Sequence, residues 1–309
     1  MLHVAVAVIR DERGRVLLSR RREGTHLAGL WEFPGGKVEP DETMEQALRR
    51  EILEETGLEI KAHRPLIGIR HDYPEKSVFL DTHLITDWTG EAHGREGQEI
   101  VWADRGMLQG YTLPEADKPI LTALSLPELY GISPPVIESE AGFLHELEMT
   151  LAGGIRLVQL RLPGYVSIGS LAEKAMLLCE AAGATLMVKE PALARRLGCG
   201  LHLRAADLMA LEECPVSLFS PMAVSCHSEE EAMQAERIGA DFITLSPVLP
   251  TASHPGADTL GWQGFASIVE KVNLPVYALG GLGEREVEIA WSNGAQGVAA
   301  IRGLWKSVT

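Results

Sequence analysis

Three glutamates, Glu51, Glu54 and Glu55, have the spacing of neighbours on one face of a helix. They lie in the segment TMEQALRREILEET, residues 43–56, whose pattern predicts a helix ending at Thr56-Gly57. Three carboxylates on one face repel each other and weaken a helix unless a hard divalent cation lies among them. Because Mg²⁺ prefers oxygen ligands and is commonly shared between carboxylates and substrate phosphates, the spacing predicts a magnesium site. The competing interpretation is a solvated acidic helix face.

The residues around this helix complete a longer pattern. Gly35 and Gly36 allow the backbone to approach a phosphate or a metal closely. Arg50 is placed to anchor a neighbouring carboxylate. The whole string, GGKVEPDETMEQALRREILEETGLEI, contains seven fixed identities at fixed spacing. Chance would produce it in roughly one of 10⁵ chains of this length, which disfavours the solvated face.

This string resembles the signature of the Nudix hydrolases, G-x5-E-x7-R-E-U-x-E-E-x-G-U with U an apolar residue, over residues 36–58. The resemblance implies an α/β/α sandwich around a mixed sheet, and cleavage of a nucleoside diphosphate linked to another group. It also implies Mg²⁺ as the cofactor, with Mn²⁺ as a substitute. The implied metal ligands are Glu51, Glu54, Glu55 and the backbone carbonyl of Gly36 or Gly35.

Similarity to the MutT-type subgroup, which removes oxidised guanine nucleotides, extends along most of the first 126 residues. It is carried by LSRRREGTHLAGLWEFPGGK (18–37), WTGEAHGREGQ (88–98) and LPEADKP (113–119). The resemblance implies that Glu96 is a further metal ligand, that Glu54 or Glu96 accepts a proton, and that Arg50 completes the catalytic set. The implied substrate-binding residues are Arg21, Phe33, Gly35, Lys37, Lys76 and Asp117.

The implied reaction is attack of a metal-activated water on a phosphorus of a triphosphate. In this subgroup 8-oxo-dGTP gives 8-oxo-dGMP and pyrophosphate, which cleans the nucleotide pool and supports DNA repair. One position departs from the pattern, because Asp117 stands where the subgroup has an asparagine that contacts the purine edge. An ionised Asp only accepts hydrogen bonds, whereas Asn donates and accepts. We therefore expect Asp117 to be protonated in a dry pocket, to contact donors only, or to change the base preference.

Several elements are expected around these motifs. Val4–Ile9 and Val16–Arg20 flank the turn residues DERG and predict a hairpin. Ser77–Ile85 and Glu99–Trp102 are expected as strands, and Pro114–Leu126 as a closing helix.

From residue 127 onward, short apolar runs alternate with helical patterns. Eight such units in about 180 residues predict a small parallel (β/α)8 TIM barrel, with an open doubly wound sheet as the alternative. The predicted domains are therefore 1–126 and 127–309. The expected strands are Leu129–Ile132, Arg156–Arg161, Thr185–Lys189, Gly200–Leu203, Met222–Cys226, Asp241–Leu245, Val276–Leu279 and Gly297–Ile301.

This second part resembles thiamine phosphate synthase and its relative TenI. The resemblance is carried in family order by YGI (130–132), VQLR (158–161), VSCHS (224–228), SPVLPT (246–251) and ALGGL (278–282). It implies a (β/α)8 barrel that binds a phosphorylated thiazole or pyrimidine. The implied ligand-binding residues are Gln159, Arg161, Asp207, Ser225, Thr251, Gly280 and Gly281.

The second part also departs from the synthase at three places. Pro163 replaces a lysine, Lys189-Glu190 replaces an Asn-Asp metal pair, and His254 replaces the basic residue of a loop. The barrel is therefore left open as a ligand-binding module, a tautomerase-like enzyme or a degenerate scaffold. His202 is interpreted as a core histidine, and Ser225 and His227 as polar groups at a strand end.

Composition excludes some partners. The 309 residues carry 28 Lys and Arg against 43 Asp and Glu, a formal net charge of −15. This charge argues against binding duplex nucleic acid through a broad basic face. No run of 18 apolar residues suggests a membrane span. The four cysteines form no C-x-x-C pair, which is typical of a reducing cytoplasm.

Three functions stay open from the sequence. The first is an 8-oxo-dGTP pyrophosphohydrolase joined to a thiamine-phosphate-synthase-like barrel. The second is a hydrolase acting on a diphosphate of the thiamine pathway. In the third, the barrel is a non-catalytic module that binds a phosphorylated ligand and regulates or stabilises the hydrolase.

Overall fold

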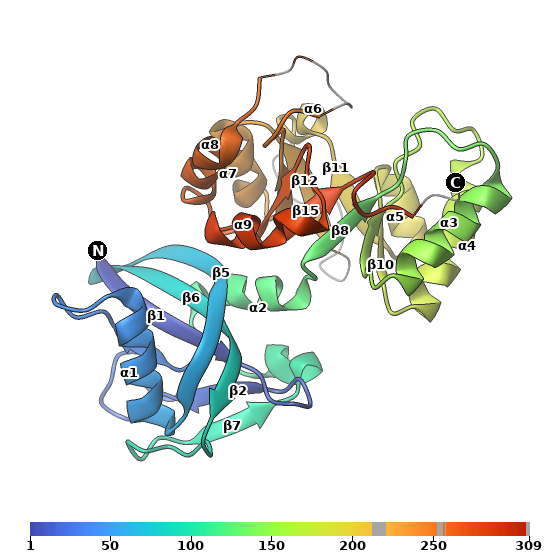
Figure 1. Ribbon diagram of the computed structural model, residues 1–309. Helices are drawn as coiled ribbons and strands as arrows, with labels where there is room; N and C mark the ends of the chain where they lie inside the picture. Colours follow the sequence, from blue (N-terminus) through green and yellow to red (C-terminus); the bar gives the residue numbers. More distant parts are fainter. Residues whose placement is uncertain (212–220, 252–255, 257, 307–309) are drawn as a thin grey trace. The chain divides into compact units, whose positions relative to one another are not determined.

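The apolar run at the start of the chain forms β1 (Leu2–Ile9), whose side chains alternate between two cores. Val6 and Val8 pack into one core, and Ala5 and Ala7 into the other, as in a strand buried on both faces. The structure is a computed structural model that describes residues 1–211, 221–251, 256 and 258–306. Its contacts divide the chain into two units, Met1–Ser125 and Leu126–Thr309 (Figure 1). Cys214 and His254 lie outside the described residues.

The first unit contains two sheets, with strand orders β4-β1-β6-β5 and β3-β2-β7. Helix α1 packs on the Ala5 side of β1 through Ala47, Leu48 and Ile52, and α2 packs in the opposite core. This arrangement confirms the α/β/α sandwich. The elements after β1 are β2 (Val16–Arg20), β3 (Trp31–Glu32), β4 (Gly35–Lys37), α1 (Met44–Thr56), β5 (Glu59–Tyr73), β6 (Lys76–Thr89), β7 (Ile100–Ala103), the 3₁₀ turns η1 (Arg105–Gly110) and η2 (Glu115–Asp117), and α2 (Lys118–Ser125).

Two local features differ from the sequence expectation. The expected hairpin is reduced to one bridge between Arg10 and Val16, because β1 pairs along its whole length with β6 while β2 pairs with β3 and β7. The segment that forms the long strand β5 carried no strand prediction. Its alternation is interrupted by Pro65 and by register shifts against β6, which hide the period-two pattern.

The second unit is a closed barrel of parallel strands in the order β10-β11-β12-β13-β14-β15-β8-β9, which confirms the (β/α)8 prediction. All eight predicted strands are present, and helices surround them (Figure 1). The strands are β8 (Leu129–Ile132), β9 (Leu157–Gln159), β10 (Thr185–Val188), β11 (Gly200–Leu203), β12 (Met222–Cys226), β13 (Phe242–Leu245), β14 (Val276–Leu279) and β15 (Gly297–Ala300). The described helices are α3 (Glu140–Ala152), α4 (Ile168–Ala181), α5 (Pro191–Leu197), α6 (Ala205–Leu208), α7 (Glu229–Arg237), α8 (Gly261–Val269) and α9 (Val287–Ser292), with the 3₁₀ turn η3 (Glu284–Glu286).

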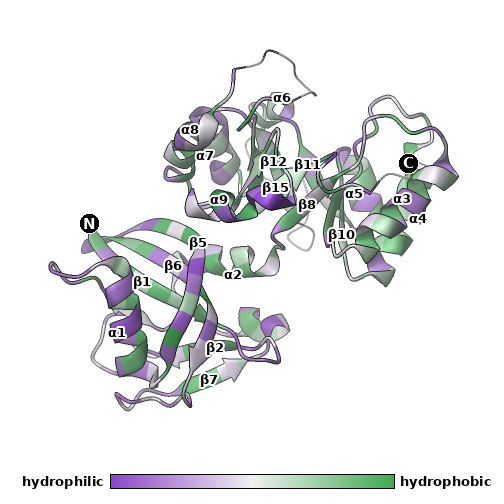
Figure 2. Cartoon of the chain, in the orientation of Figure 1, coloured by the Kyte–Doolittle hydropathy of each residue, from purple (hydrophilic) through white to green (hydrophobic). Residues whose placement is uncertain are grey.

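The interior of the barrel is packed mainly with apolar side chains. Large rings pack inside it, with Tyr130, Phe242 and Tyr277 in mutual contact. The outer faces of the strands pack against the helices in a second, larger core. Figure 2 shows the resulting difference between hydrophobic strands and helices with mixed surfaces. Among the described residues, no helix has the length and apolar character needed to cross a membrane.

A chain of polar side chains crosses the larger sheet of the first unit. His3 on β1 and His83 on β6 lie 3.0 and 3.2 Å from the two carboxylate oxygens of Asp81. His83 Nδ1 is 3.0 Å from Nδ1 of His63 on β5, and His63 Nε2 is 3.7 Å from Glu45 of α1. Burial, followed by the neighbouring His83, lowers the pKa of His63. A hydrogen bond between two Nδ1 atoms requires that one of them carries no proton.

We expect the first unit to lose stability as the pH falls below about 6.5, the ordinary pKa of histidine. The unfolded chain then binds a proton that the folded His63 resists, so the stability it contributes is present above that pH and is lost as the pH falls through the lowered pKa. Calorimetry of the full chain from pH 8 to pH 5 measures this change. His63→Phe should reduce the fall in Tm of the first unit, and an equal fall in the variant would contradict the assignment.

Candidate functional site

Helix α1 is held in position by its two ends. At its start, the Thr43 hydroxyl accepts from the Gln46 N–H, and the Gln46 side chain accepts from the Thr43 N–H at 2.8 Å. This reciprocal cap fixes the first turn. At its end, Gly57 has φ +75°, a left-handed conformation, and its N–H donates to the carbonyl of Leu53. The acidic residues of α1 are thereby fixed next to β4, which α1 contacts.

Arg50 binds most of the acidic residues at this site. Its guanidinium donates to both carboxylate oxygens of Glu42, at 2.5 and 3.1 Å. It also lies 2.8 Å from Glu51 and 3.3 Å from Glu54, and it donates to the carbonyl of Lys37 at 3.1 Å. The hydrogen bonds to Glu42 and Glu51 raise the pKa of Arg50, so its charge is permanent. Arg50 therefore ties α1 to the segment that follows β4.

The two glycines of β4 bring backbone against the carboxylates. Gly35 has φ +154°, and a side chain there would collide with the carbonyl of Ala5 on the neighbouring strand. A side chain at Gly36 would occupy the space that the carboxylate of Glu51 fills. The Gly35 N–H donates to Glu55 Oε2 at 3.1 Å. Only glycine at both positions leaves room for this arrangement.

Glu55 is a partly buried carboxylate without a cationic partner among the described residues. Burial raises its pKa to about 8, and the nearby charges of Glu32, Glu51 and Glu96 raise it further, against the effect of the Gly35 N–H. The loop that carries Glu96 is attached beside it, because the Gln98 amide donates to the Glu55 carbonyl at 3.0 Å. Three other carboxylates, those of Glu32, Glu51 and Glu96, therefore lie close enough to Glu55 to affect its pKa.

The residues fit a divalent cation, although their side chains do not surround one point. Glu51 and Glu54 bind Arg50, and Glu55 binds the Gly35 N–H. Within the part of the chain that the structure describes, no group of three His, Cys, Asp or Glu side chains has the arrangement of a metal site. The donors are hard oxygens, and three neighbouring carboxylates add to the rise in the pKa of Glu55 that burial causes. Both features are what Mg²⁺ or a similar ion requires.

A second group of residues, which we call the Asp117 cluster, contains Arg21, Glu32, Phe33, Tyr73 and Asp117. Arg21 forms an ion pair with Glu32, and the Phe33 N–H donates to Asp117. Asp117 is 7% exposed, and burial raises its pKa to about 7, with Glu32 adding to the rise and Arg21 opposing it. The charge of Asp117 in turn contributes to raising the pKa of Tyr73, after burial. This carboxyl is therefore partly protonated near neutral pH.

Some of the site residues predicted for the first unit are exposed. Lys37 and Lys76 are exposed, and Lys76 pairs with Tyr73 at the turn between β5 and β6. Glu96 is half exposed and forms an ion pair with Arg22 at 3.1 Å. Sequence reasoning assigned no role to Glu32 or Tyr73. Glu32 lies within the segment that carried the MutT-type resemblance and could have been found there, whereas Tyr73 carried no signal.

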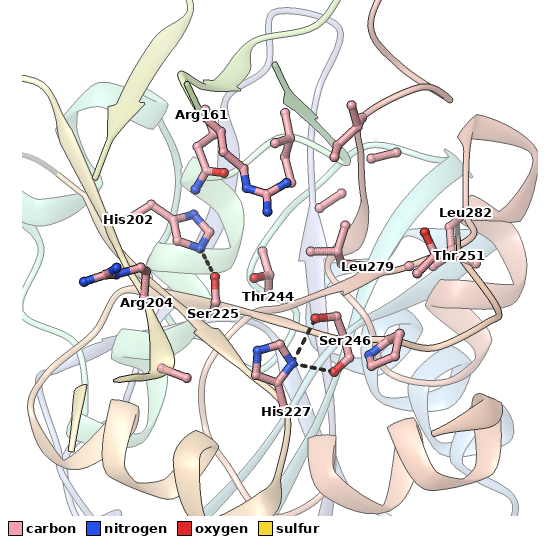
Figure 3. Close-up of a pocket in the computed structure, with 18 of the residues that line it drawn as sticks. Arg161, His202, Arg204, Ser225, His227, Thr244, Ser246, Thr251, Leu279 and Leu282 are labelled. Atoms are coloured by element: carbon pink, nitrogen blue, oxygen red, sulfur yellow. Dashed lines mark hydrogen bonds between the residues drawn. The ribbon is translucent and has the colours of Figure 1, made fainter. Parts of the chain in front are cut away.

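In the second unit, a cavity of about 1020 Å³ lies at the carboxyl ends of the barrel strands (Figure 3). It is lined by the predicted residues Gln159, Arg161, Ser225, Thr251, Gly280 and Gly281. Asp207 is not among its lining residues. Its two carboxylate oxygens accept from Arg204, at 2.7 and 2.8 Å. Sequence reasoning assigned no ligand role to the other basic lining residues, Lys189, Arg204 and Arg302.

Two histidines line this cavity in different surroundings (Figure 3). His202 is 1% exposed, and burial, with Lys189 and Arg161 adding, lowers its pKa to about 3, so it is neutral. His227 is exposed, and its Nδ1 lies 2.8 Å from the carbonyl of Ser246. That contact requires a proton on Nδ1 and leaves Nε2 of the neutral ring as an acceptor.

Comparison with known proteins matches each unit to a family. The model described as NUDIX domain matches residues 5–123, and the one described as thiamine monophosphate synthase matches residues 129–304. Over 124 residues the chain is 38% identical to an 8-oxo-dGTP diphosphatase of Haemophilus influenzae, covering 40% of this chain and 91% of that protein. It is 37% identical over 123 residues to the CTP pyrophosphohydrolase of Escherichia coli, covering 40% and 90%.

The second unit has its own relatives. Over 183 residues the chain is 38% identical to a candidate thiamine-phosphate synthase of Aquifex aeolicus, covering 58% of this chain and 97% of that protein. The match spans nearly the whole relative, as the matches of the first unit do. The chain is therefore a hydrolase that belongs to the Nudix family through its first unit and to the thiamine monophosphate synthase family through its second.

Proposed function

We propose that the first unit hydrolyses a nucleoside triphosphate, 8-oxo-dGTP, to the monophosphate and pyrophosphate with Mg²⁺. The observation that carries the proposal is the partly buried Glu55 beside the Gly35–Gly36 backbone, whose pKa of about 8 reflects burial and three further carboxylates. Nudix hydrolases generally use divalent metals, and Mn²⁺ is the expected substitute. The H. influenzae relative supports the substrate.

Each residue of the site has a proposed task. Glu51, Glu54, Glu55, Glu96 and the Gly36 carbonyl would hold the metal, which supplies Lewis acidity and neutralises charge on the phosphates. Arg50 orients Glu51 and Glu54 through its contacts at 2.8 and 3.3 Å. Glu54 or Glu96, both of which reach solvent, accepts the proton of the attacking water.

The Asp117 cluster is the proposed base-binding region, with Arg21, Lys37 and Lys76 near the phosphates or the base edge. A protonated Asp117 has one donor and one acceptor, as asparagine does, so its pKa of about 7 favours the protonated alternative at neutral pH and below. An ionised Asp117 would instead favour a base that presents only donors.

The barrel is proposed to bind a small phosphorylated molecule, such as a thiazole or pyrimidine phosphate. Gly280 and Gly281 have φ +106° and +69°, and a side chain at Gly281 would come within 2.5 Å of the Pro250 carbonyl. Backbone can therefore approach a phosphate closely at this end of β14. The Aquifex relative supports a ligand of this class.

A panel of substrates tests the proposed hydrolysis. Release of pyrophosphate and of phosphate is measured for 8-oxo-dGTP, dGTP, CTP and thiamine diphosphate, with Mg²⁺, with Mn²⁺ and with EDTA. We expect the highest kcat/KM for 8-oxo-dGTP, and loss of activity in EDTA that Mg²⁺ restores. Preference for thiamine diphosphate would overturn the substrate and support the alternative in which both units act on one pathway.

Replacing Glu54 by Gln should lower kcat by about 10²-fold or more, because it removes a metal ligand and a proton acceptor. Glu45→Gln is the matched control, since both glutamates lie on α1, are 55% exposed and form an i,i+4 ion pair with an arginine. The control should keep nearly full turnover. Turnover close to wild type in Glu54→Gln would remove the catalytic assignment.

The pH profile tests Asp117. We expect kcat/KM for 8-oxo-dGTP to fall as the pH rises through about 7, because Asp117 then loses its proton and its ability to donate. Asp117→Asn should keep activity at pH 8.5, since the amide donates at every pH. If wild type and variant show the same alkaline limb, Asp117 does not contact the base through a donated hydrogen bond.

A further inference from the structure

A chain of hydrogen bonds runs from the barrel interior into the cavity. The Tyr130 hydroxyl is 2.7 Å from His202 Nδ1, and His202 Nε2 is 2.9 Å from Ser225 Oγ (Figure 3 shows the second contact). Tyr130 is fully buried, and His202 Nδ1 is the only acceptor that its hydroxyl reaches among the described residues. A buried hydroxyl donor requires an acceptor. Tyr130 therefore donates to Nδ1, and the proton of the neutral His202 is on Nε2.

The position of the His202 proton fixes the direction of both hydrogen bonds, from Tyr130 to His202 and from His202 to Ser225. Because His202 donates from Nε2, Ser225 Oγ accepts, and the Ser225 hydroxyl hydrogen is left to point elsewhere. Ser225 lines the cavity. Since the pKa of His202 is lowered to about 3, protonation does not reverse this order near neutral pH. Ser225 therefore offers a hydrogen-bond donor to the cavity.

Cationic side chains lie next to this donor. Arg161 and Lys189 line the cavity, and neither side chain forms an ion pair within the described residues. They are close enough that Arg161 contributes to lowering the pKa of Lys189, after burial. Arg204 also lines the cavity, and its charge is balanced by Asp207. The region at the ends of β9–β12 thus carries unbalanced positive charge.

Among the described residues that line the cavity, carboxylates that could hold a metal are lacking. Glu231 is the single acidic residue among the described lining residues, and it accepts from the His227 N–H at 2.6 Å. Asp207 is occupied by Arg204. Mg²⁺ sites use carboxylates together with substrate phosphates. The one carboxylate here already accepts a hydrogen bond, so it does not supply the ligands of such a site. The positive charge needed by an anion comes from the side chains themselves.

We propose that Arg161, Lys189 and Ser225 form an anion subsite that binds a phosphate group of a small ligand directly, without a divalent metal. The inference rests on the proposed function of the barrel and adds to it the contact residues and the independence from metal. Tyr130 and His202 are positioning residues that act through Ser225.

Titration calorimetry of the full chain with inorganic phosphate tests the subsite, in EDTA and in Mg²⁺. We expect binding with equal Kd in both, and a Kd at least tenfold weaker for Lys189→Met. Lys271→Met, at an exposed position of the same unit, is the matched control and should bind as wild type. Binding that disappears in EDTA, or unchanged binding in Lys189→Met, would overturn the subsite while leaving a phosphate site elsewhere in the barrel. Absence of any phosphate binding would overturn the barrel's proposed ligand class as well.

The direction of the hydrogen bonds from Tyr130 through His202 to Ser225 has a separate test. In ¹⁵N-edited NMR spectra, His202 should be neutral at pH 6 with its proton on Nε2. Tyr130→Phe removes the group that fixes this tautomer, so phosphate binding should weaken about as much as in Ser225→Ala. A proton on Nδ1 in the wild-type chain would refute the chain of donors even if Lys189 proved essential.

Discussion

The first unit depends on one electrostatic constraint: the carboxylates of Glu51, Glu54 and Glu55 on α1 are held close together beside β4. Arg50 balances part of this charge through Glu42, Glu51 and Glu54, and it cannot lose its own proton. Glu55 lies beyond its contacts and keeps a raised pKa. The fold thus holds Glu55 where its ionised form is disfavoured, and under the proposed function a bound cation would stabilise that form.

The cavity of the barrel has the opposite charge. Its cavity gathers positive charge and hydrogen-bond donors, and its acidic neighbours are already occupied by Arg204 or by a backbone N–H. A histidine in the middle of that field stays neutral because it is buried beside cations. The two candidate sites therefore differ in charge: the first unit gathers carboxylates, and the cavity of the second gathers cationic side chains.

The sequence predicted most of the barrel architecture, because its strands are short segments that are buried along most of their length. The strands are mainly apolar, so a short apolar run was sufficient to locate each one, as at β13. The spacing of the acidic residues on α1 also predicts a magnesium site, and this stays a prediction. The strand β5 was missed because Pro65 and its register shifts break the alternation. The pKa of Asp117 and the partners of Arg50 could not be predicted, since they depend on residues brought together by the tertiary fold.

The closed strand order of the barrel has a consequence for its ligands. Strand β10, which precedes Lys189, is four strands away from β14, which precedes Gly280, in a ring of eight. The two places therefore face each other across the mouth, separated by the width of the barrel. Under the proposed function, a molecule that contacted both places would have to span this width, so its length as well as its charge would decide whether it binds both.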